Sequence, residues 1–286
     1  MPNKLVILMK ILWKIMEFLL LFVRYCFIMN LTLIMGESIE VGELIAVLSG
    51  KGGTGKTSVC AGIAAALAAS GRRVLCIDCD VGLRNLDISL GLADTASLSF
   101  LEVCRGHYPL TQATVHPQFP SLSFLTAPMN CAIDYIDSDA FGELVHDARK
   151  FYDFILLDAP AGVDAGFRLT AAFVDRCIIV TGPGPAAVRD AERTGQLLEL
   201  MGKTNVRLIV NRVDKKMVSA MSITIDDVMD SAGLPLLGVV PEDLNVTLAA
   251  AVGQPLLKYK PRCAASKACR RIANRIQGLP EPIGLR

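Results

Sequence analysis

The octapeptide Gly50-Lys51-Gly52-Gly53-Thr54-Gly55-Lys56-Thr57 constrains the fold of this chain more strongly than any other stretch. It matches the pattern G-x-x-x-x-G-K-[ST], whose glycines let successive backbone N–H groups turn toward phosphate oxygens. The apolar run 44–49 predicts a buried strand before the loop, and the alanine-rich run 58–70 predicts a helix after it. This order places the positive end of a helix dipole at the phosphates, as a nucleotide-binding loop requires.

The loop assigns roles to individual residues. We expect Lys56 to reach the β- and γ-phosphates of ATP and the Thr57 hydroxyl to ligate Mg²⁺. The remaining residues from Gly50 to Ser58 are predicted to make the other nucleotide contacts. A second lysine, Lys51, follows the first glycine, where the general pattern requires no charge.

Three aspartates lie at or just after the ends of predicted strands, where phosphate-binding folds place carboxylates. Segment 72–78 predicts a buried strand that ends at Asp78, and Asp80 follows two residues later. Segment 151–158 predicts another buried strand, which delivers Asp158 at its carboxyl end in a Walker B pattern. Strand ends beside a P-loop are where Mg²⁺ and the attacking water lie. The alternative is a loop of solvated aspartates, and the spacing alone leaves it open.

These motifs resemble the MinD/ParA family of deviant P-loop ATPases. The form KGGTGKT contains that family's early lysine, and the string GLRNLD at 82–87 resembles the switch I sequence of its MinD branch. The resemblance implies that Lys51 acts on the phosphates of a partner subunit and that Asp80 positions or activates the attacking water. It also implies that Asp78 and Asp158 support the Mg²⁺ shell.

The resemblance extends to later parts of the chain. Segment 159–162 corresponds to switch II, and Asn211, at the end of predicted strand 206–210, corresponds to the residue that reads the adenine base. Pro241, after predicted strand 236–240, corresponds to the second wall of the base pocket.

Predicted helix 186–201 corresponds to the family segment that docks regulators. The resemblance therefore implies partner contacts at Arg189, Asp190 and Glu192. Alternatively, the charged first turn of this helix is simply exposed to solvent and binds no partner.

Strands and helices alternate through residues 43–277. Further elements are predicted at 101–105, 122–126, 140–150, 176–181 and 264–277. Such alternation implies right-handed βαβ crossovers and a single doubly wound, mostly parallel sheet of α/β type with helices on both faces. The nucleotide is expected at the carboxyl ends of the strands. We expect one ATPase domain at 43–279, an extension at 1–42 and a proline-containing tail at 280–286.

The N-terminal stretch 1–35 accounts for much of the mean hydropathy of +0.45. Polar residues recur there at intervals of seven and share one side of a helix, at Asn3, Lys10, Glu17 and Arg24. The pattern is typical of an amphipathic helix in a membrane interface, and its charges argue against a spanning helix. Two interpretations stay open, an anchor of this kind and a native start at Met29 or Met35.

The C-terminal tail departs from the family pattern. MinD proteins typically end in a short amphipathic helix that binds the membrane, whereas Pro280 and Pro282 prevent such a helix in 280–286. We expect the N-terminal stretch to supply the membrane contact instead.

Charge and cysteine content disfavour other classes. The formal net charge of +1 gives no electrostatic reason to expect nucleic-acid binding. The nine cysteines are scattered through apolar segments, which is typical of reduced thiols in a cytosolic protein. Cys76 and Cys79 form a C-x-x-C, but strand residues three apart face opposite sides, so packing is favoured over a zinc or redox site.

The sequence therefore predicts a Mg²⁺-dependent ATPase. By the resemblance, it dimerises on ATP and acts as a spatial switch in placing the cell-division site, with a MinC-like septum inhibitor and a MinE-like or other topological regulator as partners. The resemblance places it in the cytoplasm, peripheral on the inner face of the cell membrane. The alternatives are a ParA-like ATPase that partitions DNA or cargo, an iron–sulfur carrier of the same superfamily, and a scaffold that binds ATP without hydrolysing it.

Overall fold

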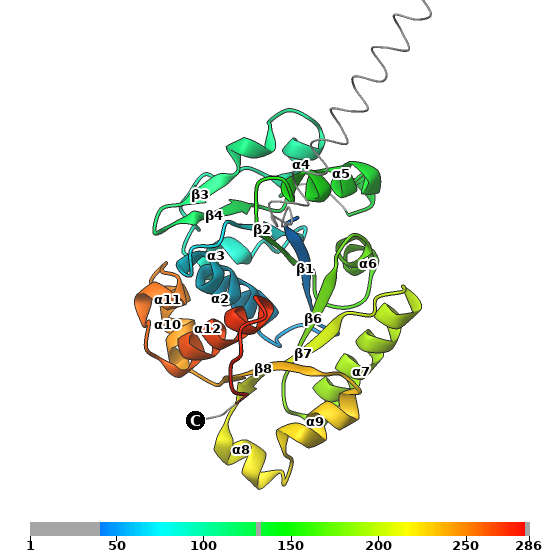
Figure 1. Cartoon of the computed structure of the whole chain (residues 1–286), viewed down its shortest axis with the longest axis vertical. Coiled ribbons are helices and arrows are strands. Elements are labelled where there is room, and N and C mark those ends of the chain that lie inside the picture. The colour runs from blue at the N-terminus through cyan, green and yellow to red at the C-terminus, as the bar shows by residue number, and fades with distance from the viewer. Residues whose placement is uncertain (1–40, 130–132, 284–286) are drawn as a thin grey trace, which may run out of the picture. The chain divides into compact units, whose positions relative to one another are not determined.

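The computed structural model describes residues 41–129 and 133–283 (Figure 1). The chain divides into two units, residues 1–41 and 42–286. The predicted N-terminal amphipathic helix lies outside the described residues, so its existence stays a prediction. Within the described ranges, no helix combines the length and the apolar character needed to cross a bilayer.

A sheet of eight strands organises the unit 42–286. Its spatial order is β3-β4-β2-β5-β1-β6-β7-β8, and every neighbouring pair is parallel except β3 with β4. The strands are β1 (Glu43–Leu48), β2 (Val74–Asp78), β3 (Thr114–His116), β4 (Phe119–Leu125), β5 (Phe154–Asp158), β6 (Arg176–Thr181), β7 (Val206–Val213) and β8 (Leu236–Pro241). Because the strand order changes direction around β1, the carboxyl end of β1 is where this class of fold binds ligands.

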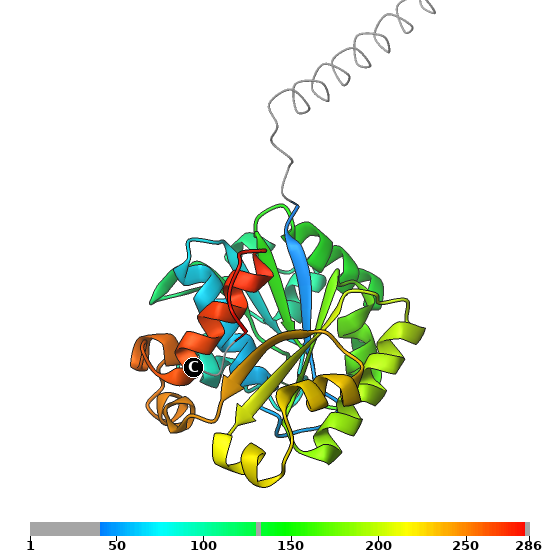
Figure 2. The same ribbon diagram turned by 60° about the horizontal axis from the view of Figure 1, so that its bottom comes forward.

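Helices cover both faces of this sheet (Figures 1 and 2). One core cluster joins the sheet to α2 (Lys56–Ala69), α3 (Leu86–Leu90), α10 (Leu244–Ala251), α11 (Leu256–Tyr259) and α12 (Ala264–Ile276). The other cluster joins it to α4 (Phe100–Cys104), α5 (Ser138–Ala148), α6 (Ala165–Ala172), α7 (Pro185–Leu200) and α9 (Ile225–Ala232). Helix α8 spans Lys215–Ala220, and short 3₁₀ turns span Leu110–Gln112 and Ile133–Tyr135. The predicted doubly wound α/β fold is confirmed.

Helix α2, which follows the P-loop, is buried along almost its whole length. Its small side chains allow this, since Gly62 lies so close to Cys269 of α12 that an added Cβ would stand 2.5 Å from the sulfur atom. A helix packed on the sheet and on α12 needs no polar face. The P-loop is therefore anchored to the most deeply buried helix of this face.

Two strands begin later than predicted, β2 at Val74 rather than 72 and β5 at Phe154 rather than 151. A pair of polar residues, Arg73 and Asp153, stands just before the two strands. Asp153 accepts a hydrogen bond from the backbone N–H of Arg73 at 2.7 Å and forms an ion pair with its guanidinium. The backbone still joins the two segments here, since the N–H groups of Asp153 and Phe154 both donate to the Arg73 carbonyl.

The tail packs against α12. Arg275, on predicted helix 264–277, donates hydrogen bonds to the carbonyls of Leu237 and Glu281. Asn274 binds the Glu281 carboxylate at 2.6 Å. As its prolines predict, the described part of the tail, 280–283, has no helix.

Candidate functional site

The P-loop connects β1 to α2 and leaves the first turn of α2 open. Gly55 is the N-cap in a left-handed conformation, with φ of 82°, and no side chain caps the helix. The first turn contains no acidic residue. Because the first N–H groups of a helix have no intrahelical partner, this N-terminus can accept an anion.

Lys56 and Asp158 form a buried ion pair at the base of the loop. Nζ of Lys56 lies 2.5 Å from Oδ1 of Asp158, and the two side chains are 6% and 1% exposed. Burial raises the pKa of Asp158, and the nearby Lys56 charge acts in the opposite direction. The Thr57 hydroxyl lies beside both groups, 3.4 Å from Nζ, and its hydrogen bond to Asp158 also opposes that rise in pKa.

These residues fit a hydrated Mg²⁺ ion. Oδ2 of Asp158 is buried and has no hydrogen-bond partner among the described residues, and the same holds for the hydroxyls of Ser49 and Thr54. Mg²⁺ in phosphate sites is held by few protein ligands, with phosphate oxygens and water completing its shell. The lack of a cluster of three or more His, Cys, Asp or Glu side chains in the described ranges is therefore compatible with such a site.

Asp78 holds both ends of the switch I loop. Its two carboxylate oxygens accept hydrogen bonds from the backbone N–H groups of Asp80 at 2.9 Å and Leu86 at 3.2 Å. Burial, reinforced by the charge of Asp158, raises the pKa of Asp78 to about 7. Asp78 therefore contacts the loop that carries Asp80, while its predicted role in the Mg²⁺ shell stays a prediction.

Within that loop, Arg84 and Asp87 form a second fixed point. Nε of Arg84 donates to Asp87 at 2.9 Å, and Arg84 has a positive φ of 47°. Asp87 is buried, whereas Leu83 at the tip of the loop is 69% exposed. The loop is thus tied at three places and presents an apolar side chain at its tip.

Asp80 is only partly buried, and its carboxylate makes no hydrogen bond or ion pair with the residues that the structure describes. Desolvation raises the pKa of Asp80, which makes it a stronger base, and the charge of Lys56 opposes this effect. A carboxylate of this kind, beside the P-loop lysine, has the properties of a group that binds a water molecule and accepts its proton.

Switch II contacts β1 and the residue directly before the P-loop through the backbone. The N–H of Gly162 donates to the Ser49 carbonyl at 3.1 Å, and the N–H of Ala159 donates to Val47. Gly162 has φ of 94°, a conformation that suits glycine. Segment 159–162 is therefore held by a backbone hydrogen bond to Ser49, the residue directly before the P-loop.

A cavity of about 250 Å³ extends from the P-loop past the ends of β7 and β8. Asn211 and Pro241 both line it, as expected for a base pocket, together with Val246, Leu256 and Cys269. Glu242, which belongs to the predicted second wall with Pro241, also lines the cavity and forms an ion pair at 3.1 Å with Arg212, a lining residue with no predicted role. Arg212 directly follows Asn211, but the strand pattern contains no signal for its side-chain contacts.

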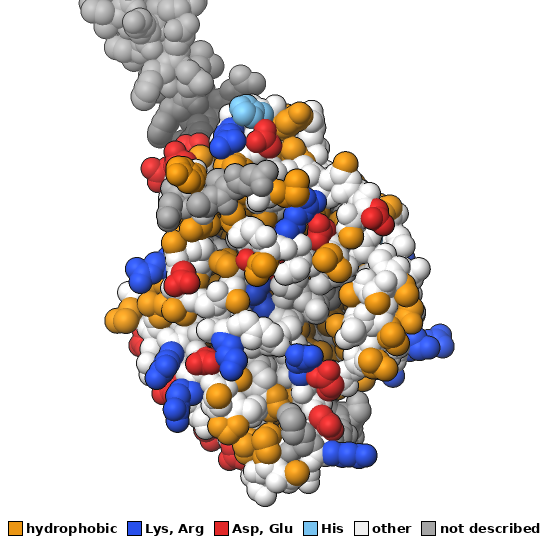
Figure 3. All heavy atoms as spheres, turned by 180° about the vertical axis from the view of Figure 1, so that it is seen from behind, with side chains coloured by type: hydrophobic (Ala, Val, Ile, Leu, Met, Phe, Trp, Pro, Cys, Tyr) orange, Lys and Arg blue, Asp and Glu red, His pale blue; other side chains and the backbone are white. Residues whose placement is uncertain are grey.

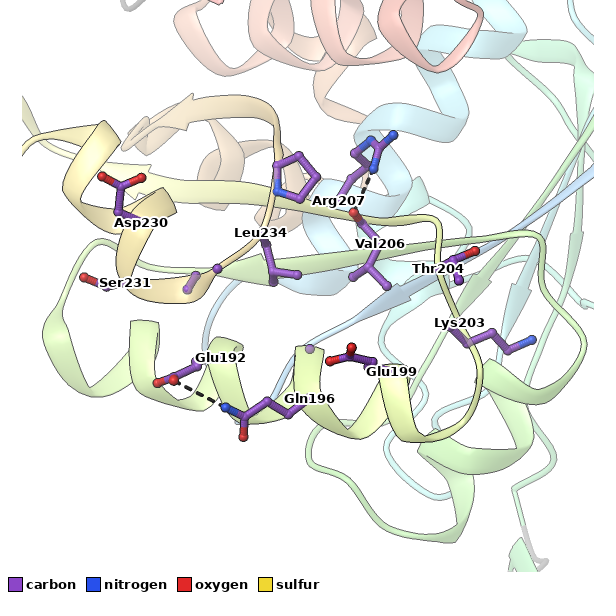
Figure 4. Close-up of a pocket in the computed structure, with 14 residues that line it drawn as sticks. Glu192, Gln196, Glu199, Lys203, Thr204, Val206, Arg207, Asp230, Ser231 and Leu234 are labelled. Atoms are coloured by element: carbon purple, nitrogen blue, oxygen red, sulfur yellow. Dashed lines mark hydrogen bonds between the residues drawn. The ribbon is translucent and has the colours of Figure 1, made fainter.

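The three predicted partner-binding residues lie on α7. Arg189 is exposed, Asp190 and Glu192 are partly buried, and Arg189 and Glu192 line a cavity of about 270 Å³ with residues of α9. Glu192 also reaches a larger groove of about 530 Å³ between α7 and the end of α9, where it accepts a hydrogen bond from Gln196 (Figure 4). Helix α7 touches the P-loop, because a Cβ on Gly50 would stand 2.6 Å from the Asp190 carbonyl oxygen.

The cysteines of the predicted C-x-x-C, Cys76 and Cys79, pack as expected from their sequence positions. Cys76 and Cys79 are buried in the two different core clusters, on opposite faces of the sheet. Cys60 of α2 and Cys76 are in van der Waals contact at 3.8 Å between sulfur atoms. Two buried cysteines that face apart cannot form the exposed thiol pair that an iron–sulfur carrier needs at a dimer interface.

Comparisons with known proteins agree with this site. Residues 45–256 match the family described as the CobQ/CobB/MinD/ParA nucleotide binding domain. The septum site-determining protein MinD of Synechocystis sp. is 37% identical over 244 residues, covering 85% of this chain and 92% of that protein.

Solved structures give the same result. The Aquifex aeolicus MinC:MinD cell division protein complex contains a chain with a TM-score of 0.79 and 34% identity, covering 85% of this chain and 98% of that one. The septum site-determining protein MinD complexed with Mg-ADP from Pyrococcus horikoshii has a TM-score of 0.70 and 30% identity, covering 82% and 96%.

Proposed function

The chain belongs to the CobQ/CobB/MinD/ParA nucleotide-binding family and, within it, to the MinD-type septum site-determining ATPases of cell division, and we propose from this that it acts as a dimeric, ATP-dependent spatial switch. ATP and Mg²⁺ are its cofactors. In this proposal two copies associate when ATP is bound, and hydrolysis separates them. The observation that carries it is the convergence of Lys56, Asp158 and Asp80 on a P-loop whose additional lysine, Lys51, is exposed.

In this proposal, the residues of the site have separate roles in binding Mg²⁺, binding the phosphates and activating water. Thr57 and Asp158 would hold Mg²⁺, which when bound neutralises phosphate charge. Lys56 would exchange its contact with Asp158 for oxygens of the β- and γ-phosphates. Asp80 would hold a water molecule and accept its proton, from a loop fixed by Asp78.

We propose that the regulators bind along α7. The Aquifex aeolicus protein was solved as a MinC:MinD complex, which supports a MinC-like septum inhibitor as partner. A MinE-like or other topological regulator that stimulates hydrolysis belongs to the same proposal. Arg189, Asp190 and Glu192 suit this role, because α7 touches the P-loop at Gly50 and so links a bound partner to the nucleotide.

The surface gives little support to the ParA-like alternative. The face shown in Figure 3 mixes Lys and Arg with Asp and Glu side chains and presents no continuous basic area. Neither this face nor the net charge of +1 provides the basic surface that non-specific DNA binding needs. Binding of duplex DNA that weakens steeply with salt would favour the ParA-like function instead.

Replacing Asp80 with asparagine is expected to slow ATP hydrolysis by about 10²- to 10⁴-fold, because the proton acceptor is lost. Mg-ATP affinity should change little, since the Asp80 carboxylate supports no contact within the described chain. Phosphate release measures the rate, and sedimentation velocity with ATP should show the variant accumulating as a dimer. Asp94→Asn, an exposed aspartate in a neighbouring loop, is the matched control. Full hydrolysis in Asp80→Asn would remove this residue from the mechanism, and a variant monomeric with ATP would contradict the dimeric switch.

We also propose that the N-terminal stretch places the protein peripherally on the inner face of the cell membrane. Its amphipathic pattern suits anchoring in the lipid interface. In co-sedimentation with anionic liposomes, the full chain should pellet and a version starting at Met35 should remain in solution. Pelleting with ATP and ADP alike would indicate a constitutive anchor, and no pelleting by either version would contradict the proposal.

A further inference from the structure

We propose that Asn211 and Arg212 are positioning residues of the phosphate-binding loop, which turn two of its peptide groups toward the phosphates. The nucleotide site of the proposed function is the premise of this inference. By family resemblance Asn211 was expected to read the base, and Arg212 had no expected role. Both side chains instead contact the backbone of the P-loop.

Two consecutive P-loop carbonyls accept hydrogen bonds from these side chains. Nδ2 of Asn211 donates to the Thr54 carbonyl at 2.8 Å, and Nη1 of Arg212 donates to the Gly53 carbonyl at 3.0 Å. In a planar trans peptide, the C=O and N–H groups point in opposite directions. Holding the carbonyls of Gly53 and Thr54 outward therefore points the N–H groups of Thr54 and Gly55 to the other side of the loop.

Those two N–H groups are available to a ligand. Neither donates a hydrogen bond to any residue in the described part of the chain. They stand at the N-terminus of α2, where backbone donors and the helix dipole favour phosphate. The contacts from Asn211 and Arg212 thus fix donors in place before the ligand arrives, which lowers the entropic cost of binding.

The backbone of β7 is strained where it supplies these contacts. Arg212 has φ of 58°, a left-handed conformation that is unfavourable for a residue with a side chain. The pairing of β7 with β8 shifts register between Val210 and Val213, which is the distortion that turns Arg212 toward the loop. Glu242 of the following loop holds the guanidinium by an ion pair at 3.1 Å. Strain of this kind persists where the surrounding structure fixes it, and it concentrates at functional sites.

The P-loop is shaped to receive Asn211. A Cβ placed on Gly55 would stand 2.3 Å from Nδ2 of Asn211, so the close approach of the amide requires glycine at this position. Gly55 therefore serves two purposes, the left-handed N-cap of α2 and the space for Asn211. This complementarity is expected if the contact between Asn211 and the loop is part of the site.

The inference is tested with a ligand that has phosphates and no base. Affinities for Mg-tripolyphosphate and Mg-ATP are measured by calorimetry in the full chain and in the variants Asn211→Ala and Arg212→Gly. A positioning role predicts that both ligands bind about tenfold more weakly in each variant, because a hydrogen bond that orients the phosphate donors is lost. A base-reading role predicts weaker ATP binding and unchanged tripolyphosphate binding.

Arg212→Gly separates positioning from general stability. Glycine adopts the backbone conformation of Arg212 without strain, so the melting temperature should not fall while phosphate affinity does. Ser222→Gly, at another residue with positive φ (51°), is the matched control and should leave both affinities unchanged. Glu242→Gln should weaken tripolyphosphate binding less than Arg212→Gly, since the contact with Gly53 remains.

The outcomes distinguish this inference from the proposed function. Wild-type protein that binds neither Mg-ATP nor Mg-tripolyphosphate would contradict the nucleotide site itself. Wild-type binding of both ligands, with unchanged tripolyphosphate affinity in Asn211→Ala and Arg212→Gly, would overturn only the positioning role. A fall in tripolyphosphate affinity in both variants with the melting temperature of Arg212→Gly preserved would support it.

Discussion

Replacing Lys56 with methionine is expected to abolish nucleotide binding and to lower the free energy of unfolding at pH 8 by about 3–5 kcal/mol. Nζ of Lys56 lies 2.5 Å from Asp158 in a site where both side chains are almost fully buried. Methionine keeps much of the volume of the lysine stem, so the expected loss does not come from a cavity. It comes from the Asp158 carboxylate, whose Oδ2 already lacks a hydrogen-bond partner among the described residues. Urea denaturation at fixed pH measures the change.

The loss of stability should depend on pH in one direction. Burial raises the pKa of Asp158 above its ordinary value of 3.8, against the opposing charge of Lys56, so removal of Lys56 raises this pKa further. A carboxyl group with a raised pKa in the folded state binds more protons there than in the unfolded chain, and stability therefore falls as pH rises from about 3.8 toward the folded pKa. The deficit of Lys56→Met should be small near pH 4 and complete at pH 8.

A double variant separates stability from binding. Lys56→Met combined with Asp158→Asn removes both charges and should recover most of the lost stability at pH 8 without recovering nucleotide binding. Lys267→Met, at an exposed lysine on α12, should change neither property. Equal unfolding midpoints for Lys56→Met and wild type at pH 8 would show that the buried pair does not determine the stability of the site.

The P-loop and the central strands could be predicted because they depend on patterns within short stretches of the sequence. The glycines of the P-loop and the apolar runs that end at Asp78 and Asp158 predict the central strands and the edge at which they deliver their carboxylates. Parallel pairing of β1 with β5, and of β5 with β2, then places these groups side by side. Periodicity and strand-end chemistry are sufficient for this because both act within a few residues.

The contacts that sequence reasoning missed all join distant segments. Arg212 reaches Gly53 across 159 positions of the chain, through a strand distortion that no hydrophobic pattern encodes. Arg275 lies on predicted helix 264–277, but nothing in the sequence indicates that its guanidinium binds the carbonyl of Leu237. Short elements such as α3 and α9 also escaped prediction, because five to eight residues contain too few turns to establish a period.

Replacing Lys51 with alanine is expected to reduce ATP hydrolysis by about 10³- to 10⁵-fold, the range found when a cation supplied by a second subunit stabilises the transferring phosphate. Lys51 is exposed and makes no ion pair within the described chain, so its loss should affect neither folding nor the binding of Mg-ATP by one subunit. Phosphate release and equilibrium binding of ATP measure the two properties. Strong loss of ATP binding together with hydrolysis would place Lys51 in its own subunit's site instead.

Mixing two inactive variants tests directly whether Lys51 crosses the interface. In a dimer of one Lys51→Ala subunit and one Asp80→Asn subunit, the site on the first subunit keeps its own Asp80 and receives an intact Lys51 from the second. If Lys51 acts across the interface, this site is complete, and a 1:1 mixture should recover up to about a quarter of wild-type activity, because half of the dimers are mixed and each has one working site. If Lys51 acts within its own subunit, both sites of the mixed dimer lack one group, and the mixture should stay as inactive as its components.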